Sequence, residues 1–146
     1  MIEITQTGST KKASGARHAP HSRQDPAPDP YETAPVIDVQ ASSPAKGLRV
    51  LRVVGDIDML TAPVLESMIA GQLQSTPDVL VLDLRKVGFM SSAGLASLIT
   101  ARKQADEAGA TLRLVATGDP VLRPLTVTGL TTIFEIHADL ETALSD

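Results

Sequence analysis

The feature that most constrains the fold is the run Val-Leu-Val-Leu-Asp-Leu at positions 79–84. All but one of its residues are apolar, which is typical of a strand that is covered on both faces. Segments with apolar residues at helical spacing lie before and after it, over residues 61–74 and 92–108. A strand between two helices indicates strand–helix–strand units, whose strands pair in parallel through right-handed crossovers. We therefore expect an α/β fold.

Further segments complete a regular order of elements from residue 36 onward. Two β-branched runs, separated by a polar spacer at 42–47, predict an antiparallel hairpin at the start. The order is β-β-α-β-α-β-α-β-α, which predicts a small mixed sheet of about five strands with about four helices packed against it. Strands are expected over 36–41, 48–54, 79–84, 111–115 and 133–136, and helices over 61–74, 92–108, 119–129 and 139–144.

Particular residues predict where the helices begin and end. Thr61 is expected to cap the first helix and Asp119 the third. Gly109 stands where the C-terminal cap of the second helix belongs. Pro124 removes a backbone donor inside the third helix, so that helix is expected to be short or kinked.

The first 35 residues differ in composition from the remainder. They contain half of the ten prolines, many Ser, Thr and Ala residues, and no apolar periodicity. Such a segment buries too little apolar surface to offset the entropy of ordering. We therefore expect a disordered tail over 1–35 and one domain over 36–146. The charges of the tail cancel, so the formal net charge of −4 belongs to the domain.

The composition argues against several classes of function. The chain has no cysteine, which excludes disulfides and thiolate metal sites. It shows no dense Lys/Arg run, so nucleic-acid binding is not expected. No window has the roughly 18 consecutive apolar residues of a membrane span. The N-terminus is polar and unlike a signal peptide, so we expect a cytoplasmic protein.

Catalytic and cofactor motifs are also missing from the sequence. Of the three histidines, His18 and His21 fall in the expected tail, and there is no Gly-x-Ser-x-Gly elbow. Asp56 and Asp58, two residues apart after a strand, are more typical of a solvated turn than of a carboxylate dyad. No Gly-x-x-x-x-Gly-Lys phosphate-binding loop occurs. We therefore expect neither an enzyme nor a bound cofactor or metal.

The most informative segment runs from Asp83 to Leu95 and places Ser91 and Ser92 at the start of a helix. The first N–H groups of a helix lack intrahelical partners and the macrodipole is positive there, so a phosphate on a serine would be partly stabilised. Serine is also among the commonest N-cap residues. The residues alone leave both interpretations open: a phosphorylated switch and an ordinary helix cap.

The same segment resembles the signature of STAS domains, especially that of bacterial anti-sigma factor antagonists. The signature reads as a strand ending in Asp-Leu, then an apolar residue, Phe-Met, Asp-Ser-Ser-Gly-Leu and a helix. The sequence Gly-Asp-Ile-Asp at 55–58 is similar to the family's Gly-Glu-Leu-Asp, and the resemblance spans about residues 36–146. The matching positions of the signature are Asp83, Leu84, Val87, Phe89, Met90, Ser92, Gly94 and Leu95.

The resemblance implies a partner switch rather than catalysis. In that family the unphosphorylated antagonist binds an anti-sigma factor that is itself a serine kinase. Phosphorylation of one serine ends the binding, and a phosphatase restores it. By position, Ser92 is the phosphoacceptor. Ser91 replaces the family's Asp, and Ala93 replaces its second Ser. The missing carboxylate at position 91 either weakens recognition by the kinase or makes Ser91 a secondary candidate for the phosphate.

The resemblance also implies a docking patch around Ser92. Asp58 matches the family's acidic residue near the site, Asp56 takes the place of its Glu, and Ala93 and Gly94 leave the helix start uncrowded. Two alternatives remain open, a STAS subunit of a membrane lipid transporter and a domain that senses a nucleotide or lipid in a pocket. The patch is expected to comprise Asp56, Asp58, Met90, Ser91, Ser92, Ala93 and Gly94.

Overall fold

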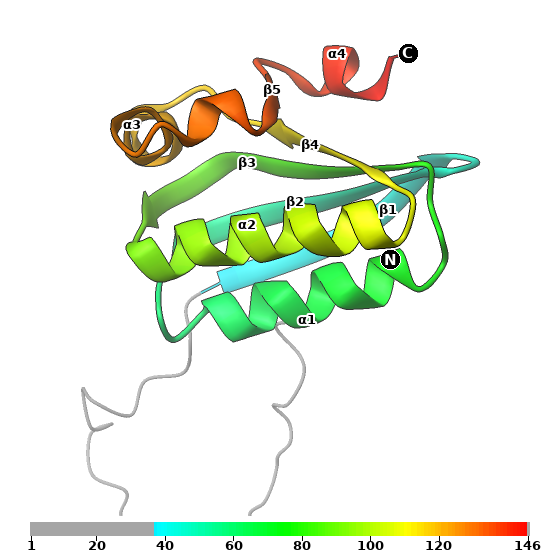
Figure 1. Cartoon of the computed structure of the whole chain (residues 1–146), viewed down its shortest axis with the longest axis horizontal. Helices are drawn as coiled ribbons and strands as arrows, with labels where there is room; N and C mark the ends of the chain where they lie inside the picture. Colours follow the sequence, from blue (N-terminus) through cyan, green and yellow to red (C-terminus); the bar gives the residue numbers. More distant parts are fainter. Residues whose placement is uncertain (1–36, 146) are drawn as a thin grey trace, which may run out of the picture.

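Between Ile37 and Ser145, five strands form one sheet, in the same order in which they occur along the chain (Figure 1). The computed structural model describes residues 37–145. β1 pairs antiparallel with β2, and all later neighbours pair in parallel. The predicted mixed sheet and the order of its elements are confirmed. The strands are β1 (Ile37–Ala45), β2 (Leu48–Ile57), β3 (Val79–Met90), β4 (Thr111–Val115) and β5 (Glu135–His137).

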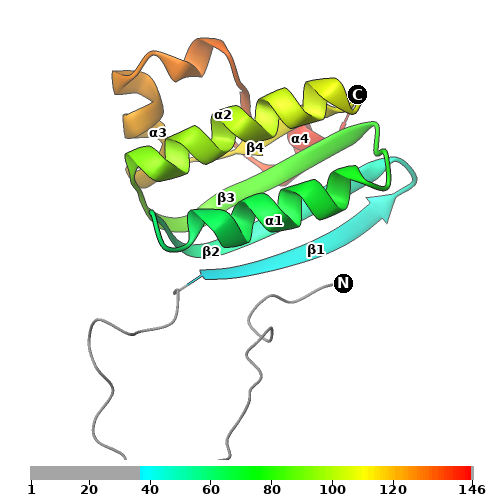
Figure 2. The same cartoon turned by 60° about the horizontal axis from the view of Figure 1, so that its bottom comes forward.

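Within the described residues, four helices and one 3-10 turn connect and follow the strands. Figure 2 shows α1 and α2 side by side on one face of the sheet, with α4 behind it. Val121 and Leu125 of α3 join the same hydrophobic core as the buried residues of α1 and α2. The elements are α1 (Ala62–Leu73), α2 (Ser92–Glu107), α3 (Asp119–Val127), the turn η2 (Leu130–Thr132) and α4 (Leu140–Leu144).

The apolar run that opens β3 is buried on both faces of the sheet. Leu80, Leu82 and Leu84 belong to the main core and are at most 1% exposed. Val81 points to the opposite face, because successive side chains of a strand alternate, and there it joins a smaller cluster that Ala143 of α4 helps to close. Burying each such side chain stabilises the fold by roughly 2 kcal/mol.

β3 is longer than the sequence predicts, because it does not end at Leu84 but continues without a loop to Met90. β2 extends to Ile57, and the two extensions pair with each other. Two register shifts in this pairing each absorb one extra residue of β3. Arg85, Lys86 and Gly88 give the segment the composition of a loop, but β2 supplies its hydrogen-bond partners. The predicted loop after Leu84 was wrong for this reason.

The ends of the sheet also differ from the prediction. Pairing of β1 with β2 continues to Ala45, so the spacer at 42–47 is not all loop, and only Lys46 and Gly47 form the turn. Gly47 has a φ of 79°, which glycine adopts without steric cost. The last strand begins at Glu135 rather than at Ile133, because Ile133 caps the η2 turn.

The helix ends follow the predicted positions, but two predicted caps differ. α2 ends at Glu107 and Gly109 follows with a φ of 76°, as expected for a C-terminal cap. α3 is short, with nine residues including Pro124, and Gly118 rather than Asp119 is its N-cap residue. Thr61 precedes α1 without a capping bond. Its hydroxyl instead donates to the Asp56 carbonyl oxygen at 2.7 Å, because Thr61 has helical rather than extended backbone angles.

The expected tail over residues 1–35 lies outside the described residues, so its disorder stays a prediction. The same holds for the proposed domain boundary at residue 36. Between Ile37 and Ser145, none of the helices combines the length and apolar character that crossing a membrane requires.

Candidate functional site

The end of the sheet where β2 and β3 finish brings two separate segments of the chain together. Ile57 is the last residue of β2, Met90 is the last residue of β3, and the two are register partners. One residue further, the N–H of Ser91 donates to the Ile57 carbonyl oxygen at 2.9 Å. The turn after β2 and the start of α2 therefore lie next to each other, at the carboxyl ends of parallel strands, where α/β proteins commonly place binding sites.

Close packing of α2 against the end of β2 depends on Gly94. A Cβ atom at this position would lie 2.9 Å from both Ile57 Cγ2 and Met90 Cγ, and 3.0 Å from the Ile57 carbonyl oxygen. These distances are shorter than the roughly 3.5–4.0 Å of a favourable carbon contact. The first turn of α2 can reach the sheet only because Gly94 has no side chain. This is the uncrowded helix start that the sequence predicts.

Ser91 and Ser92 have different roles at the start of α2. Ser91 is the N-cap residue, and its Oγ accepts from the N–H groups of Ala93 at 3.2 Å and Gly94 at 3.4 Å. Ser92 is the first residue of the helix and is exposed. The cap is therefore provided by Ser91, which leaves the Ser92 hydroxyl accessible.

The two aspartates of the predicted patch are not equivalent. Asp58 is half-buried, and its Oδ1 accepts from the N–H groups of Leu60 at 2.9 Å and Thr61 at 3.1 Å. Its carboxylate therefore holds the turn into α1, in the way that aspartates often bond to nearby backbone groups. Asp56 is exposed and stands opposite Phe89 in the pairing of β2 with β3. Asp56 presents its charge to solvent, whereas Asp58 shapes the turn.

Other residues of the predicted patch add little exposed surface. Met90 is 4% exposed and belongs to the main core. Gly94 is buried and Ala93 is half-buried. Met90 and Gly94 thus support the surface from beneath, while Asp56 and Ser92 are the positions of the predicted patch that face solvent.

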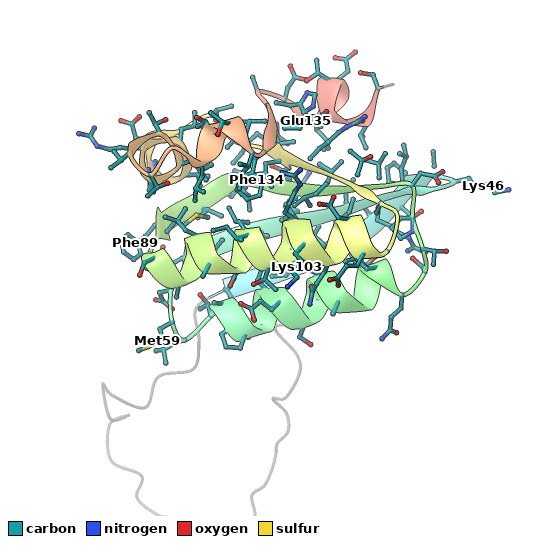
Figure 3. All side chains as sticks on the ribbon, in the orientation of Figure 1. Lys46, Met59, Phe89, Lys103, Phe134 and Glu135 are labelled. Carbon is teal, nitrogen blue, oxygen red and sulfur yellow. The ribbon has the colours of Figure 1, made fainter. Side chains whose placement is uncertain are left out.

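The sequence reasoning missed three exposed apolar residues at this end of the molecule. The exposed fractions are 76% for Met59, 63% for Leu60 and 51% for Phe89. Met59 and Leu60 lie in the turn before α1, and Figure 3 shows Met59 and Phe89 at the same end of the structure. The sequence does contain a signal for exposed apolar residues here, because Met59 and Leu60 stand between Asp58 and Thr61, in the short connection between a strand and a helix.

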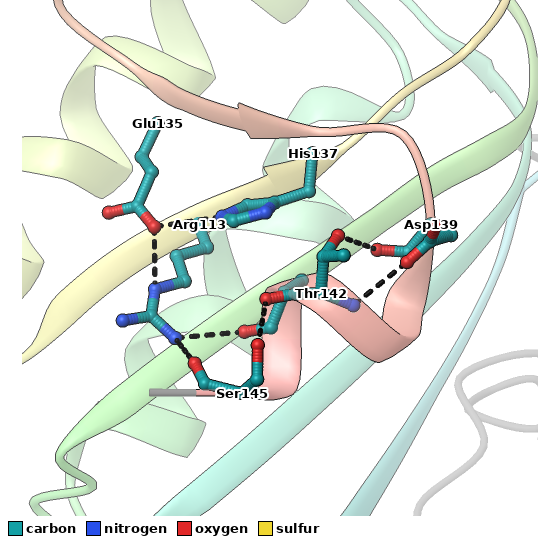
Figure 4. A network of polar contacts seen from close by, with 7 residues as sticks. Arg113, Glu135, His137, Asp139, Thr142 and Ser145 are labelled. Atoms are coloured by element: carbon teal, nitrogen blue, oxygen red, sulfur yellow. Dashed lines mark hydrogen bonds and ion pairs between the residues drawn. The ribbon is translucent and has the colours of Figure 1, made fainter.

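A polar network on the α4 side holds the C-terminal segment against the sheet. Arg113 Nε pairs with the Glu135 carboxylate at 2.8 Å, and its Nη1 donates to the carbonyl oxygens of Ala143 and Ser145, each at 2.9 Å (Figure 4). The Asp139 carboxylate caps α4 by accepting from the Thr142 N–H at 2.8 Å. These groups bond one another, and no three potential metal-ligating side chains of residues 37–145 come together.

Asp83 on β3 is the buried carboxylate of the same face. It is 2% exposed and accepts from Arg85 Nε at 2.9 Å and from Arg85 Nη2 at 2.8 Å. Burial alone would raise the pKa of this carboxyl, but hydrogen bonds from Arg85 and the positive charges of Arg85 and Arg52 outweigh it and lower the pKa below its ordinary value. The Asp83–Arg85 pair is thus a structural ion pair.

Comparison with known proteins assigns the family. The model of the STAS domain matches residues 38–143. The anti-sigma-F factor antagonist RsfB of Mycobacterium tuberculosis is 33% identical over 99 residues, which are 68% of this chain and 80% of that protein. The anti-sigma-B factor antagonist of Bacillus subtilis is 29% identical over 91 residues, which are 62% of this chain and 83% of that protein.

A solved structure supports the same assignment. The crystal structure of an anti-sigma factor antagonist from Mycobacterium paratuberculosis is 34% identical to this chain. It superposes with a TM-score of 0.68 and covers 74% of this chain and 91% of the other. This chain belongs to the anti-sigma factor antagonist family of STAS-domain proteins.

Proposed function

We propose that this chain binds an anti-sigma factor with the end of the molecule that carries Ser92, and that phosphorylation of Ser92 ends the binding. The relatives described above are anti-sigma factor antagonists, which are binding proteins rather than enzymes. They favour this function over the transporter-subunit and ligand-sensing alternatives. Because bacterial transcription takes place in the cytoplasm, the switch is proposed to act there.

The observation that carries the proposal is the exposed hydroxyl of Ser92 at the first position of a helix of 16 residues. A phosphate on this oxygen would stand beside the N–H groups of the first turn and the positive end of the helix dipole. It would add about −1.5 to −2 charges to a small surface. That change is large enough to alter which partner can close over the surface.

Ser92 is a substrate in this mechanism and not a catalytic residue. The partner's kinase activity would transfer the γ-phosphoryl group of ATP to Ser92 Oγ, with loss of the hydroxyl proton, and a phosphatase would reverse the step by hydrolysis. Ser91 is the weaker candidate, because its Oγ already accepts from two backbone N–H groups. Modifying Ser91 would disturb the cap of α2.

The test is a phosphorylation assay with purified proteins. The chain is incubated with ATP, Mg²⁺ and each anti-sigma factor of the organism that encodes it, and the phosphosite is mapped by peptide mass spectrometry. We expect one phosphate on Ser92, none on Ser92→Ala and an unchanged site on Ser91→Ala. Ser97, which is fully buried and bonded to Glu66, serves as an internal serine that should stay unmodified. A phosphate that persists on Ser92→Ala, or no phosphate with any of these factors, would contradict the proposal.

A further inference from the structure

Three exposed apolar side chains lie on the two chain segments that meet next to Ser92. This group, called here the Met59 patch, consists of Met59, Leu60 and Phe89, each more than half exposed. Large apolar side chains that are exposed on a protein surface do not stabilise its fold, and clusters of them commonly mark interaction sites. The patch therefore calls for a partner that covers it.

The pairing of β2 with β3 fixes the position of the patch relative to Ser92. Phe89 is the register partner of Asp56, and Met90 is that of Ile57. Met59 and Leu60 are two and three residues after Ile57, and Ser92 is two residues after Met90. The bond from the Ser91 N–H to the Ile57 carbonyl oxygen, 2.9 Å long, ties the two segments together. Ser92 is consequently held at the end of the sheet where Figure 3 shows Met59 and Phe89.

The charge around the patch indicates what kind of partner fits it. The two segments that build this end, residues 55–62 and 87–97, contain Asp56 and Asp58 and no cation. A complementary surface would have an apolar centre and Lys or Arg at its rim. A partner with an acidic rim would instead be repelled by the unmodified chain.

We infer that the anti-sigma factor covers the Met59 patch with an apolar surface rimmed by basic residues, and that a phosphate on Ser92 releases it through the cost of desolvation. The inference rests on the proposed function and adds how the switch works. A basic rim attracts a phosphate, so simple charge repulsion would not release this partner. Removing water from a phosphate dianion against apolar side chains costs far more free energy than an exposed charge pair returns.

The first test replaces the apolar side chains one at a time. Met59→Ser and Leu60→Ser should each weaken binding to the purified anti-sigma factor roughly tenfold in isothermal titration calorimetry, as central apolar contacts do. Both side chains are so exposed that the fold should be unaffected, which thermal unfolding checks. Wild-type affinity in both variants would overturn the inference.

Ile133→Ser is the matched control. Ile133 is 39% exposed, and its carbonyl oxygen accepts a hydrogen bond from Arg102, ten positions along α2 from Ser92. At 1.5 Å per helical residue, Arg102 is about 15 Å along α2 from Ser92, so Ile133 is bonded to a part of α2 well removed from its first turn. Its replacement should leave the affinity unchanged. A loss equal to that of Leu60→Ser would overturn the inference, because binding would then not be centred on the Met59 patch.

The second test separates desolvation from repulsion by varying salt. The affinity ratio of wild type to Ser92→Glu is measured at roughly 0.05 M and 0.5 M salt, between which the Debye length shortens about threefold and exposed charges are screened more strongly. We expect a ratio that is at least as large at the higher salt concentration, because salt screens the attraction of the basic rim and leaves the desolvation cost in place. A ratio that falls severalfold at high salt would show repulsion and overturn the desolvation mechanism, while the proposed function would stand.

A second copy of this chain is the rival occupant of the patch. Sedimentation of the chain alone distinguishes it: we expect a monomer that Met59→Ser does not change. A dimer that becomes a monomer in Met59→Ser would assign the patch to self-association and overturn the inference. If the wild type binds no anti-sigma factor of its organism, the proposed function fails together with the inference, whereas failure of the patch variants alone leaves the proposed function intact.

Discussion

The α4 side of the sheet and the end that carries Ser92 use their side chains in opposite ways. On the α4 side, Arg113 bonds Glu135 and two carbonyl oxygens at the end of α4, and Asp83 bonds Arg85. At the other site, Ser92 and Met59 face solvent. Charged groups that bond one another within the chain stabilise the fold, whereas exposed hydroxyl and apolar groups are available to a partner. The comparison predicts that substitutions will separate into effects on stability and effects on binding.

The largest expected effect is on stability, at Gly94, whose missing side chain lets α2 approach the sheet. Gly94→Ala should lower the free energy of unfolding by about 2–3 kcal/mol, because the new Cβ overlaps Ile57 and Met90. Gly71→Ala is the matched control, since Gly71 lies in α1 with no atom within 4 Å of an added Cβ. It should stabilise the protein by about 0.5–1 kcal/mol through helix propensity. Urea unfolding measures both; equal effects would contradict the tight approach of α2 to the sheet.

The next effect concerns the buried ion pair on the α4 side. Asp83→Asn should cost about 2 kcal/mol at neutral pH, less than for a fully buried pair, because the partner side chains Arg85 and Arg52 are 35% and 53% exposed. Asp56→Asn, at the exposed carboxylate of the other site, should change the stability by no more than about 0.5 kcal/mol. Chemical unfolding of the two variants tests the contrast, and a larger loss in Asp56→Asn would reverse it.

The same pair predicts a dependence of stability on pH. The pKa of Asp83 is lowered in the folded protein from its ordinary value of 3.8. Its contribution is therefore fully present above that value and is lost as the pH falls through the lower folded pKa. The difference in unfolding free energy between wild type and Asp83→Asn should be constant near neutral pH and shrink only below 3.8. A difference that already shrinks well above this pH would contradict the lowered pKa.

The smallest expected effect compares two neighbouring serines. Ser91→Ala should lower stability by about 1 kcal/mol, because the cap of α2 is lost. Ser92→Ala should change it by less than about 0.5 kcal/mol, since the hydroxyl is exposed and alanine is a good helix former. Thermal unfolding of the two variants in parallel distinguishes the roles. If Ser92→Ala were the more damaging substitution, Ser92 rather than Ser91 would be the cap.

Much of the fold could be predicted because it depends on local patterns. The periodicity of the apolar residues gives the order of strands and helices, and Gly109 marks the end of α2. The length of β3 could not be predicted, because residues 85–90 depend on pairing with β2 through two register shifts. Such pairing is a long-range property that the polar composition of the segment conceals.

The site was only partly predictable for a related reason. The signature predicts Ser92 as the phosphoacceptor, but its residues do not tell which side chains face solvent. Met90 matches the signature and is buried, whereas Met59 lies outside it and is exposed. Which of the two apolar residues enters the core depends on the turn held by Asp58. That turn is formed by hydrogen bonds from backbone N–H groups to the Asp58 side chain, and the periodicity of apolar residues does not predict such bonds.

The most direct test of the account is the affinity of the wild type and three variants for the proposed anti-sigma factor partner. Wild type and Ser92→Ala should bind alike in the absence of ATP, and Ser92→Glu should bind at least about tenfold more weakly. Ser67→Glu, the same charge at an exposed position of α1, should bind like the wild type. Unchanged affinity in Ser92→Glu would contradict a switch centred on Ser92.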